Sequence, residues 1–304
     1  MSFSITKLKL AKCEDRNVLA TNINNPEALI KPSLGKEYNS YNFNFFVDWN
    51  RTPYEIKPVF WITRLLRYKV DLSKISNSEI LNAFNENGGQ EYLKNLNKVL
   101  GSYGKIECVL LGEREGDKVN SMSPYWKIDI ENNIKTNTVN HLSKLIFKSR
   151  GGEAAMGSKG LMYGTSGIEC YLSKTGNNYP GDCDSLISKD GKVAAIIEFK
   201  KHTLDDNISN HLAGKYYSQG KDIRKYEALF ALGRMFNNSP PVIILYFSTK
   251  QRVFRLQCVD ASEGNWLVKS DSNNIFFNDI RHYKALLREH LITSFLNIGS
   301  TYGL

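Results

Sequence analysis

One stretch, residues 180–202, constrains the fold of this chain more than any other. An apolar run at residues 193–197 ends in Glu198-Phe199-Lys200, and the polar segment 189–192 precedes that run. The polar segment contains Asp-Gly, which tolerates the positive φ angles of tight turns, so we expect a hairpin of two strands. Acidic and lysine side chains are seldom fully buried without a partner. Charges placed directly after a buried strand therefore indicate a site.

The hairpin is expected to bring a second carboxylate to the end of the apolar strand. Strand side chains alternate between faces, so Glu198 and Lys200 point the same way. Asp184 precedes the turn and lies next to apolar residues of the first strand. Hard divalent cations prefer carboxylate and carbonyl oxygens, and a cation-bound water loses its proton more readily. We predict that Asp184 and Glu198 bind Mg²⁺, which Mn²⁺ can replace, and that Lys200 assists the attacking water.

This arrangement resembles the PD-(D/E)XK nuclease superfamily, which includes many restriction endonucleases, Holliday-junction resolvases and repair nucleases. The resemblance rests on Asp184 and on Glu198-Phe199-Lys200, with Gly181-Asp182 just ahead, and it covers roughly residues 181–250. It implies a metal bound by Asp184 and Glu198, with Phe199 in the ligand set, and Lys200 as a catalytic residue. It also implies a restriction-endonuclease-like core.

The first element of the family motif departs from the usual Pro-Asp pair. It is either Cys183-Asp184 or Pro180 followed by Gly181 and Asp182. We favour Asp184 as the metal ligand, because we expect it inside the strand and expect Asp182 in the turn after Pro180.

The resemblance also suggests residues outside the motif. Many relatives carry an acidic residue on a preceding helix, and Glu153 is our catalytic candidate for it, with Glu169 second; a solvated glutamate in a glycine-rich loop is the alternative for Glu153. Several branches place a Gln or Lys on the helix after the second strand, which we expect at residues 219–236. That helix can also simply pack on the sheet with a solvated basic face. The candidate nucleic-acid-binding residues are Lys201, Gln219, Lys221 and Lys225.

Charge and missing motifs narrow the function further. The net charge of +9 favours a polyanionic partner, because each neutralised phosphate releases counterions. No P-loop, dinucleotide fingerprint or hydrolase elbow occurs. The leading hypothesis is a metal-dependent endonuclease acting on DNA, with a restriction or phage-defence role. The alternatives are a non-catalytic nucleic-acid-binding or interaction protein, a repair or junction-resolving nuclease, and a metal-dependent nucleotide phosphohydrolase. A surface hairpin with a solvated Glu198–Lys200 ion pair is the purely structural alternative.

Cysteine and histidine usage bears on metal binding and location. The five cysteines are far apart and form no CxxC pair, which predicts reduced thiols in the cytoplasm and no structural zinc. His202 is expected partly exposed at a strand end, or in contact with a phosphate or water. The other histidines show no metal-ligand spacing with cysteine or acid. We expect no signal peptide and no membrane span. A homodimer or a partner protein remains open.

The rest of the chain predicts a mixed α/β fold, with a central mixed sheet flanked by helices and an N-terminal α+β region. We place a substrate- or partner-recognition region at residues 1–138 and the nuclease domain at 139–304. No internal repeat is visible. The expected strands lie at residues 41–45, 105–111, 242–247 and 252–259. The expected helices lie at residues 58–70, 76–84, 90–100, 139–148, 219–236 and 277–296, and residues 131–140 are expected to form a linker.

Overall fold

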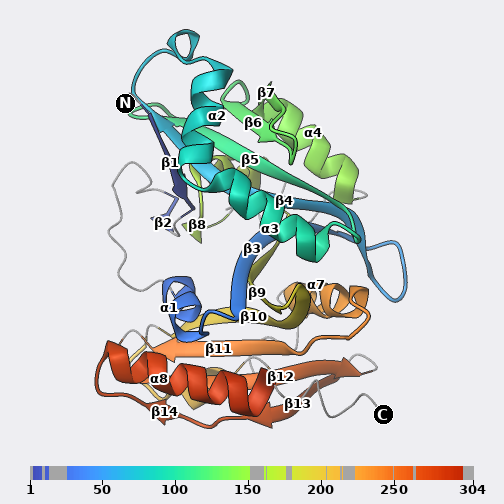
Figure 1. Ribbon diagram of the computed structural model, residues 1–304, viewed down its shortest axis with the longest axis vertical. Helices are drawn as coiled ribbons and strands as arrows, with labels where there is room; N and C mark the ends of the chain where they lie inside the picture. Colours follow the sequence, from blue (N-terminus) through green and yellow to red (C-terminus); the bar gives the residue numbers. More distant parts are fainter. Residues whose placement is uncertain are drawn as a thin grey trace. The chain divides into compact units, whose positions relative to one another are not determined.

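The computed structural model has a mixed α/β fold (Figure 1). It describes residues 3–8, 11–13, 26–150, 161, 163–175, 180–202, 204–212, 214, 223–248, 250–262 and 265–296. The chain forms two compact units, each built from more than one segment. Unit 1 comprises Met1–Asn22, Phe43–Arg51 and Lys57–Gly181, and unit 2 comprises Ile23–Asn42, Thr52–Ile56 and Asp182–Leu304. Among the described helices, none is both long and apolar enough to cross a bilayer.

The strands of unit 1 pair in a mixed pattern. Strand β4 pairs with β1 in the antiparallel sense and with β5 in the parallel sense, and β5, β6 and β7 follow as antiparallel neighbours. Helices α4 and α5 contribute Leu142 and Ile168 to a core that also holds Trp61 and Val109. The elements are β1 (Phe3–Lys7), β2 (Ala11–Lys12), the later part of β3 (Tyr38–Asp48), β4 (Glu55–Tyr68), η1 (Leu72–Lys74), α2 (Asn77–Glu86), α3 (Gly89–Leu100), β5 (Lys105–Arg114), β6 (Pro124–Ile128), β7 (Ile134–Thr138), α4 (Val139–Arg150), β8 (Tyr163–Gly164) and α5 (Gly167–Lys174).

The strands of unit 2 also pair in a mixed pattern, and β9 and β10 carry the motif. Strand β9 forms a hairpin with β10, β10 pairs in parallel with β11, and β11, β12 and β13 are antiparallel neighbours. The elements are α1 (Pro26–Ser33), the first residues of β3, β9 (Gly181–Lys189), β10 (Lys192–His202), η2 (Ile208–His211), α7 (Ile223–Met235), β11 (Val242–Ser248), β12 (Val253–Ser262), β13 (Asn265–Asp271), β14 (Ile275–Phe276), α8 (Ile280–His290) and a π-helical segment (Leu291–Leu296).

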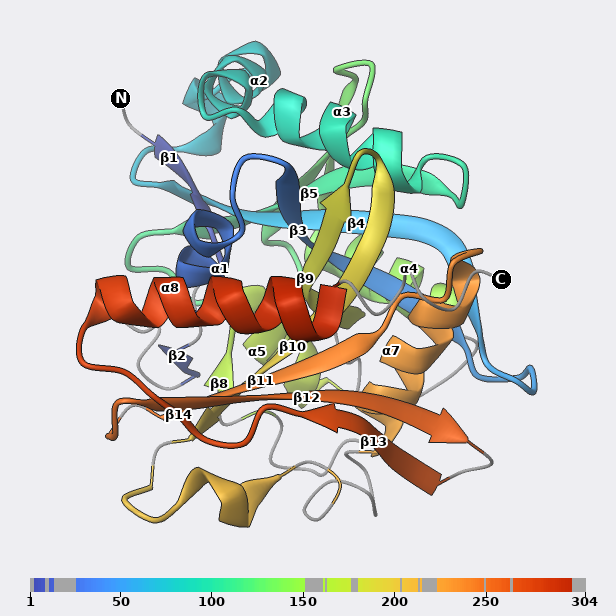
Figure 2. The same ribbon diagram turned by 60° about the horizontal axis from the view of Figure 1, so that its bottom comes forward.

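Helices cover both faces of the strands of unit 2. Helices α1 and α8 lie side by side on one face (Figure 2), where Leu287 of α8 packs in a core with Ile197 of β10. Because strand side chains alternate, Ile196 and Glu198 point to the opposite face. Helix α7 lies on that face, since Gly233 faces the side chains of Ile196 and Val242. The E-x-K face of β10 is therefore turned toward α7.

The two units repeat one order of strands and helices, a repeat that is invisible in the sequence. In each unit, two consecutive strands are followed by a helical connection to a third strand, which runs parallel to the second. Two antiparallel strands and a helix come after the third strand. The two units also share a contact between a cation and an aromatic ring. In unit 1, Arg64 of β4 lies 5.0 Å from the ring centroid of Tyr92 on α3. In unit 2, Lys200 of β10 lies 5.3 Å from the ring centroid of Tyr226 on α7. Two residues before Arg64 stands Ile62, which is buried and matches the place of Glu198. Unit 1 thus carries the same scaffold with an apolar residue where unit 2 has the buried acid.

Most of the predicted elements are present, and two predictions were wrong. The capping box of Ser76 and Glu79 starts α2 as expected. Residues 58–70, predicted as a helix, lie largely in strand β4, which is rich in aromatic and β-branched residues that favour a strand buried between layers. Residues 131–140, predicted as a linker, contain β7, because Ile134 and its neighbours pair with β6.

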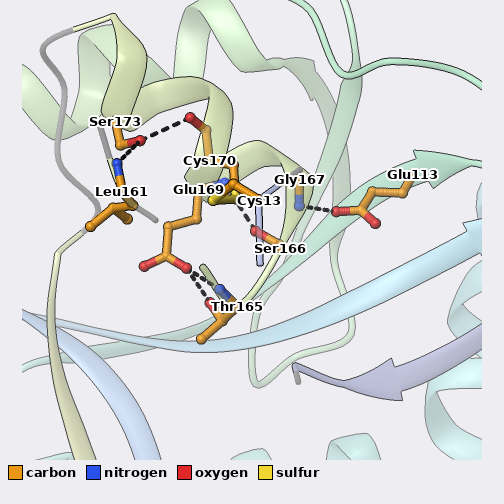
Figure 3. The surroundings of a disulfide bond; sticks show 9 residues. All are labelled: Cys13, Glu113, Leu161, Thr165, Ser166, Gly167, Glu169, Cys170 and Ser173. Atoms are coloured by element: carbon orange, nitrogen blue, oxygen red, sulfur yellow. Dashed lines mark hydrogen bonds between the residues drawn. A yellow bond between two sulfur atoms is a disulfide. The ribbon is translucent and has the colours of Figure 1, made fainter. Parts of the chain in front are cut away.

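The expectation that all thiols are reduced was also wrong for two cysteines. Cys13 and Cys170 form a disulfide that links the segment after β2 to α5 (Figure 3). The described free thiols, Cys108, Cys183 and Cys258, are buried. The two bonded residues are 157 positions apart, and that separation offered no sequence signal for pairing. Disulfides are typical of oxidising compartments, so a cytoplasmic location stays a prediction.

Candidate metal centre and catalytic site

The β9–β10 hairpin brings the two predicted metal ligands face to face. Ser185 pairs with Ile197 in the antiparallel register, so the next pair outward is Asp184 and Glu198. Side chains of directly opposed residues have Cβ atoms about 5 Å apart. The backbone N–H of Phe199 donates a 2.8 Å hydrogen bond to Oδ2 of Asp184. Strand pairing and this hydrogen bond together fix the orientation of the Asp184 carboxylate.

Glu198 is the most deeply buried charged residue of the site, with 0% of its surface exposed. Its Oε1 atom lies 2.7 Å from Nζ of Lys225 and 3.1 Å from Nζ of Lys200. Within the described part of the chain, its Oε2 atom has no hydrogen-bond partner. An ionised buried carboxylate needs partners for both oxygens, so Oε2 marks a place for a further ligand.

The electrostatics of Asp184 point to the same need for positive charge. Burial, and next the negative charge of Glu198, raise the pKa of Asp184 well above its ordinary value. The ammonium of Lys225 and the Phe199 amide oppose this rise without cancelling it. Burial disfavours the charge of Lys225, yet the surrounding carboxylates, Asp182 first, raise its pKa well above the ordinary value. Positive charge is thus strongly favoured between these acids.

Asp182 lies on strand β9, not in the turn where we expected it. It is two residues from Asp184 and therefore shares its face. Its Oδ1 atom lies 3.5 Å from Nζ of Lys225, and 53% of its side chain is exposed. The cluster therefore contains a third carboxylate, which lies on its solvent-exposed side. Asp182 and Asp184 are thus not exclusive alternatives as metal ligand, because both belong to the cluster.

Helix α7 contributes two residues that sequence reasoning misread or missed. Lys225 was predicted to contact nucleic acid from a solvated face, but its ammonium lies between Glu198 and Asp182. Tyr226 was not singled out beyond helix packing; its ring faces the ammonium of Lys200 at 5.3 Å. The one sequence signal for either contact is that the lysine and the tyrosine are adjacent on an amphipathic helix.

The remaining predicted residues lie elsewhere or outside the described chain. The Phe199 side chain packs against the core on the other face of β10, so a metal contact would have to come from its carbonyl and stays a prediction. Lys201 is exposed at the end of β10. Glu169, on α5 of unit 1, accepts hydrogen bonds from the hydroxyl and the backbone N–H of Thr165 (Figure 3). Three candidates, Glu153, Gln219 and Lys221, lie outside the described residues.

The donor set of the cluster fits a hard divalent cation. It offers the carboxylates of Asp182, Asp184 and Glu198, which is an all-oxygen set of the kind that Mg²⁺ and Mn²⁺ prefer. With Lys200 and Lys225 the formal charge of the cluster is −1 when all five groups are ionised. A net negative cluster repels a phosphodiester, and a divalent cation would reverse its sign.

Comparisons with known proteins add no family. No protein-family model and no curated protein matches the chain. Among solved structures, the sex pheromone staph-cAM373 precursor is 12% identical, with 89% of this chain and 86% of that chain covered and a TM-score of 0.20. A sex pheromone precursor from Lactobacillus salivarius subsp. salivarius UCC118 is 10% identical, with 79% and 68% covered and a TM-score of 0.18. Likeness at these TM-scores carries no argument about fold or function, so the geometry of the carboxylate cluster is the main evidence on activity.

Proposed function

We propose that the chain is a metal-dependent endonuclease that hydrolyses phosphodiester bonds in DNA, with a restriction or phage-defence role as the biological setting. The observation that carries the proposal is the opposition of Asp184 to the fully buried Glu198, whose Oε2 atom has no partner among the described groups. Burying that acid is costly, and a site with this composition at a strand end supports a catalytic use.

Asp184, Glu198 and Asp182 would hold the cation. When bound, Mg²⁺ would lower the pKa of a coordinated water and neutralise charge on the phosphate. The chain supplies the orientation: the Phe199 amide holds Asp184, and both lysines hold Oε1 of Glu198. Oε2 of Glu198 is thereby left to face the ligand.

In this proposal Lys200 acts on the attacking water. Its ammonium is 3.1 Å from Glu198 and lies over the ring of Tyr226, and 22% of its side chain is exposed. An ammonium held in this way can orient a water or stabilise negative charge that develops on the phosphate. Lys225 lies between Glu198 and Asp182, and its ammonium favours the ionised form of Asp182, whose pKa lies below its ordinary value.

A second candidate function has one observation in its favour. Both ammonium groups already neutralise Oε1 of Glu198, so the cluster is partly compensated without a metal. A non-catalytic nucleic-acid-binding protein that keeps the scaffold would show this pairing too. Repair or junction-resolving activity differs from the main proposal only in substrate.

The test is a cleavage assay with the full chain. Supercoiled and linear duplex DNA, single-stranded DNA, RNA and mononucleotides are incubated with Mg²⁺, Mn²⁺ or EDTA. The Lys200→Ala variant is compared with Lys192→Ala, which changes an exposed lysine at the other end of the same strand. We expect metal-dependent DNA cleavage that Lys200→Ala lowers at least a hundredfold and Lys192→Ala leaves unchanged.

Three results would count against the proposal. Equal cleavage by both variants would show that the site is misassigned. Turnover of mononucleotides alone would replace the nuclease with a phosphohydrolase. Salt-sensitive DNA binding without cleavage of any substrate would favour the non-catalytic protein.

A further inference from the structure

A second group of metal-ligating side chains lies beyond the carboxylate cluster. His202 ends β10, Asp206 lies in the following bend, and His211 ends η2. The Nε2 atom of His202 is 3.0 Å from Oδ1 of Asp206, and that of His211 is 2.7 Å from Oδ2. One potential ligand atom from each residue lies within 4.8 Å of the others. Two imidazoles thus converge on a single carboxylate.

Sequence reasoning found no metal spacing here because it sought cysteine pairs and regular motifs. The ligands are separated by three and by four residues, and the turn between β10 and η2 folds them together. His202 was expected partly exposed, but only 7% of its surface is accessible. Both imidazoles present Nε2 to the carboxylate of Asp206, so nitrogen and oxygen donors come together at one place.

The loop that carries these side chains is held by hydrogen bonds from two other segments. Gln251 donates a 2.8 Å hydrogen bond from Nε2 to the carbonyl of Asp205. Asn274 donates from Nδ2 to Oδ1 of Asn207 at 3.0 Å, and the Asn207 side chain also accepts from the backbone N–H of Ser209. A loop fixed at several points keeps its ligands in place, which lowers the entropy lost on binding.

We propose that His202, Asp206 and His211 form a binding site for a divalent transition metal, Zn²⁺ first of all. Two imidazole nitrogens and one carboxylate make a ligand set that Zn²⁺ takes in proteins, with ligand distances of about 2.0–2.2 Å. Imidazole ligands select against Mg²⁺, which prefers oxygen. Three protein ligands leave a fourth position for water or another ligand, and 44% of the Asp206 side chain is exposed.

This site is distinct from the carboxylate cluster and does not depend on the proposed function. His202 lies four residues beyond Glu198, about 13 Å along the strand. Two of its three ligands are imidazoles, whereas the candidate ligands of the cluster at Asp184 are all carboxylates. Bound metal would join the end of β10 to η2, so its first effect is on stability.

The experiment measures Zn²⁺ and Co²⁺ binding to the metal-free full chain by calorimetry, and Co²⁺ also by visible absorption. The variants are Asp206→Asn and His211→Asn, with His290→Asn as a matched control on α8 outside the cluster. A Glu198→Gln variant reports any binding at the carboxylate site. Melting temperatures without metal verify that each variant is folded.

We expect one equivalent of Zn²⁺ at this site, counted apart from any ion at the carboxylate cluster, with intense Co²⁺ absorption typical of four-coordinate sites and a higher melting temperature with Zn²⁺. Asp206→Asn and His211→Asn should weaken Zn²⁺ binding at least tenfold, whereas His290→Asn and Glu198→Gln should not. An excess of Mg²⁺ should not compete. Absence of Zn²⁺ binding, or binding that both cluster variants retain at full affinity, would overturn the proposal and leave a hydrogen-bonded clasp of two imidazoles and a carboxylate.

Discussion

Replacing Asp184 by asparagine separates the stability of the carboxylate site from its chemistry. Asparagine keeps an oxygen that can accept the hydrogen bond from the Phe199 N–H, at 2.8 Å in the native protein. It removes a negative charge that faces Glu198 across the hairpin. Asp184→Asn should therefore stabilise the metal-free protein while it abolishes metal-dependent activity, as is common where function requires a strained site.

The size of the effect follows from the geometry. Two unit charges about 5 Å apart, the spacing of directly opposed strand residues, repel by about 3 kcal/mol at an effective dielectric constant of 20. Lys225, whose ammonium also favours ionised Asp184, offsets part of this repulsion. We therefore expect Asp184→Asn to raise the free energy of unfolding by about 1–2 kcal/mol, or the melting temperature of unit 2 by about 2–8 °C.

The assay is thermal and urea unfolding in EDTA and in Mg²⁺. Asp190→Asn, in the exposed hairpin turn, is the matched control, because asparagine also tolerates the positive φ of that position. In EDTA the Asp184→Asn variant should be more stable than the wild type, and Mg²⁺ should stabilise only the wild type and the control. Lower stability of Asp184→Asn in EDTA, or equal stabilisation of it by Mg²⁺, would refute the reasoning.

Three further predictions concern pH, Lys225 and the disulfide. Because the pKa of Asp184 is raised on folding, the folded state binds a proton more tightly than the unfolded chain does. The free energy of unfolding of the metal-free protein should therefore fall as pH rises from about 4 through the folded pKa. Urea unfolding at pH 5.5 and pH 8 measures the change, and an increase with pH would contradict the prediction. Lys225→Met should cost about 1–3 kcal/mol, less than a fully buried pair because the ammonium is partly exposed; calorimetry in EDTA measures this loss, and an unchanged melting temperature would contradict it. Cys13→Ser should destabilise unit 1 by about 2–5 kcal/mol; scanning fluorimetry with and without reductant tests this, and an equal response of variant and wild type to reductant would contradict it.

Local signals account for the parts of the fold that the sequence predicted. The capping box at Ser76, the Asp-Gly turn at residues 190–191 and the apolar run of β10 each act over a few neighbouring residues, and each predicted element is present. The opposition of Asp184 and Glu198 does not follow from the turn alone, because a β-bulge between Val193 and Ala195 shifts the register of the hairpin by one residue.

Long-range contacts account for what the sequence could not predict. Lys225 reaches Glu198 only because α7 crosses the face of β10, which no spacing along the chain encodes. Strand β4 was predicted as a helix because a short apolar segment fits both periods, and its pairing with β5 decides between them. The disulfide and the His202–Asp206–His211 group likewise depend on how the chain folds back on itself.

The repeated strand order provides the chain with an internal reference. The two units share one order of strands and helices, yet Ile62 stands in one where Glu198 stands in the other. Changes of solvent or denaturant act on both units, whereas titration or cation occupancy at the β9–β10 hairpin acts on unit 2. A comparison of the free energies of unfolding of the two units would therefore separate the energetic cost of the buried charge from the stability of the scaffold that holds it.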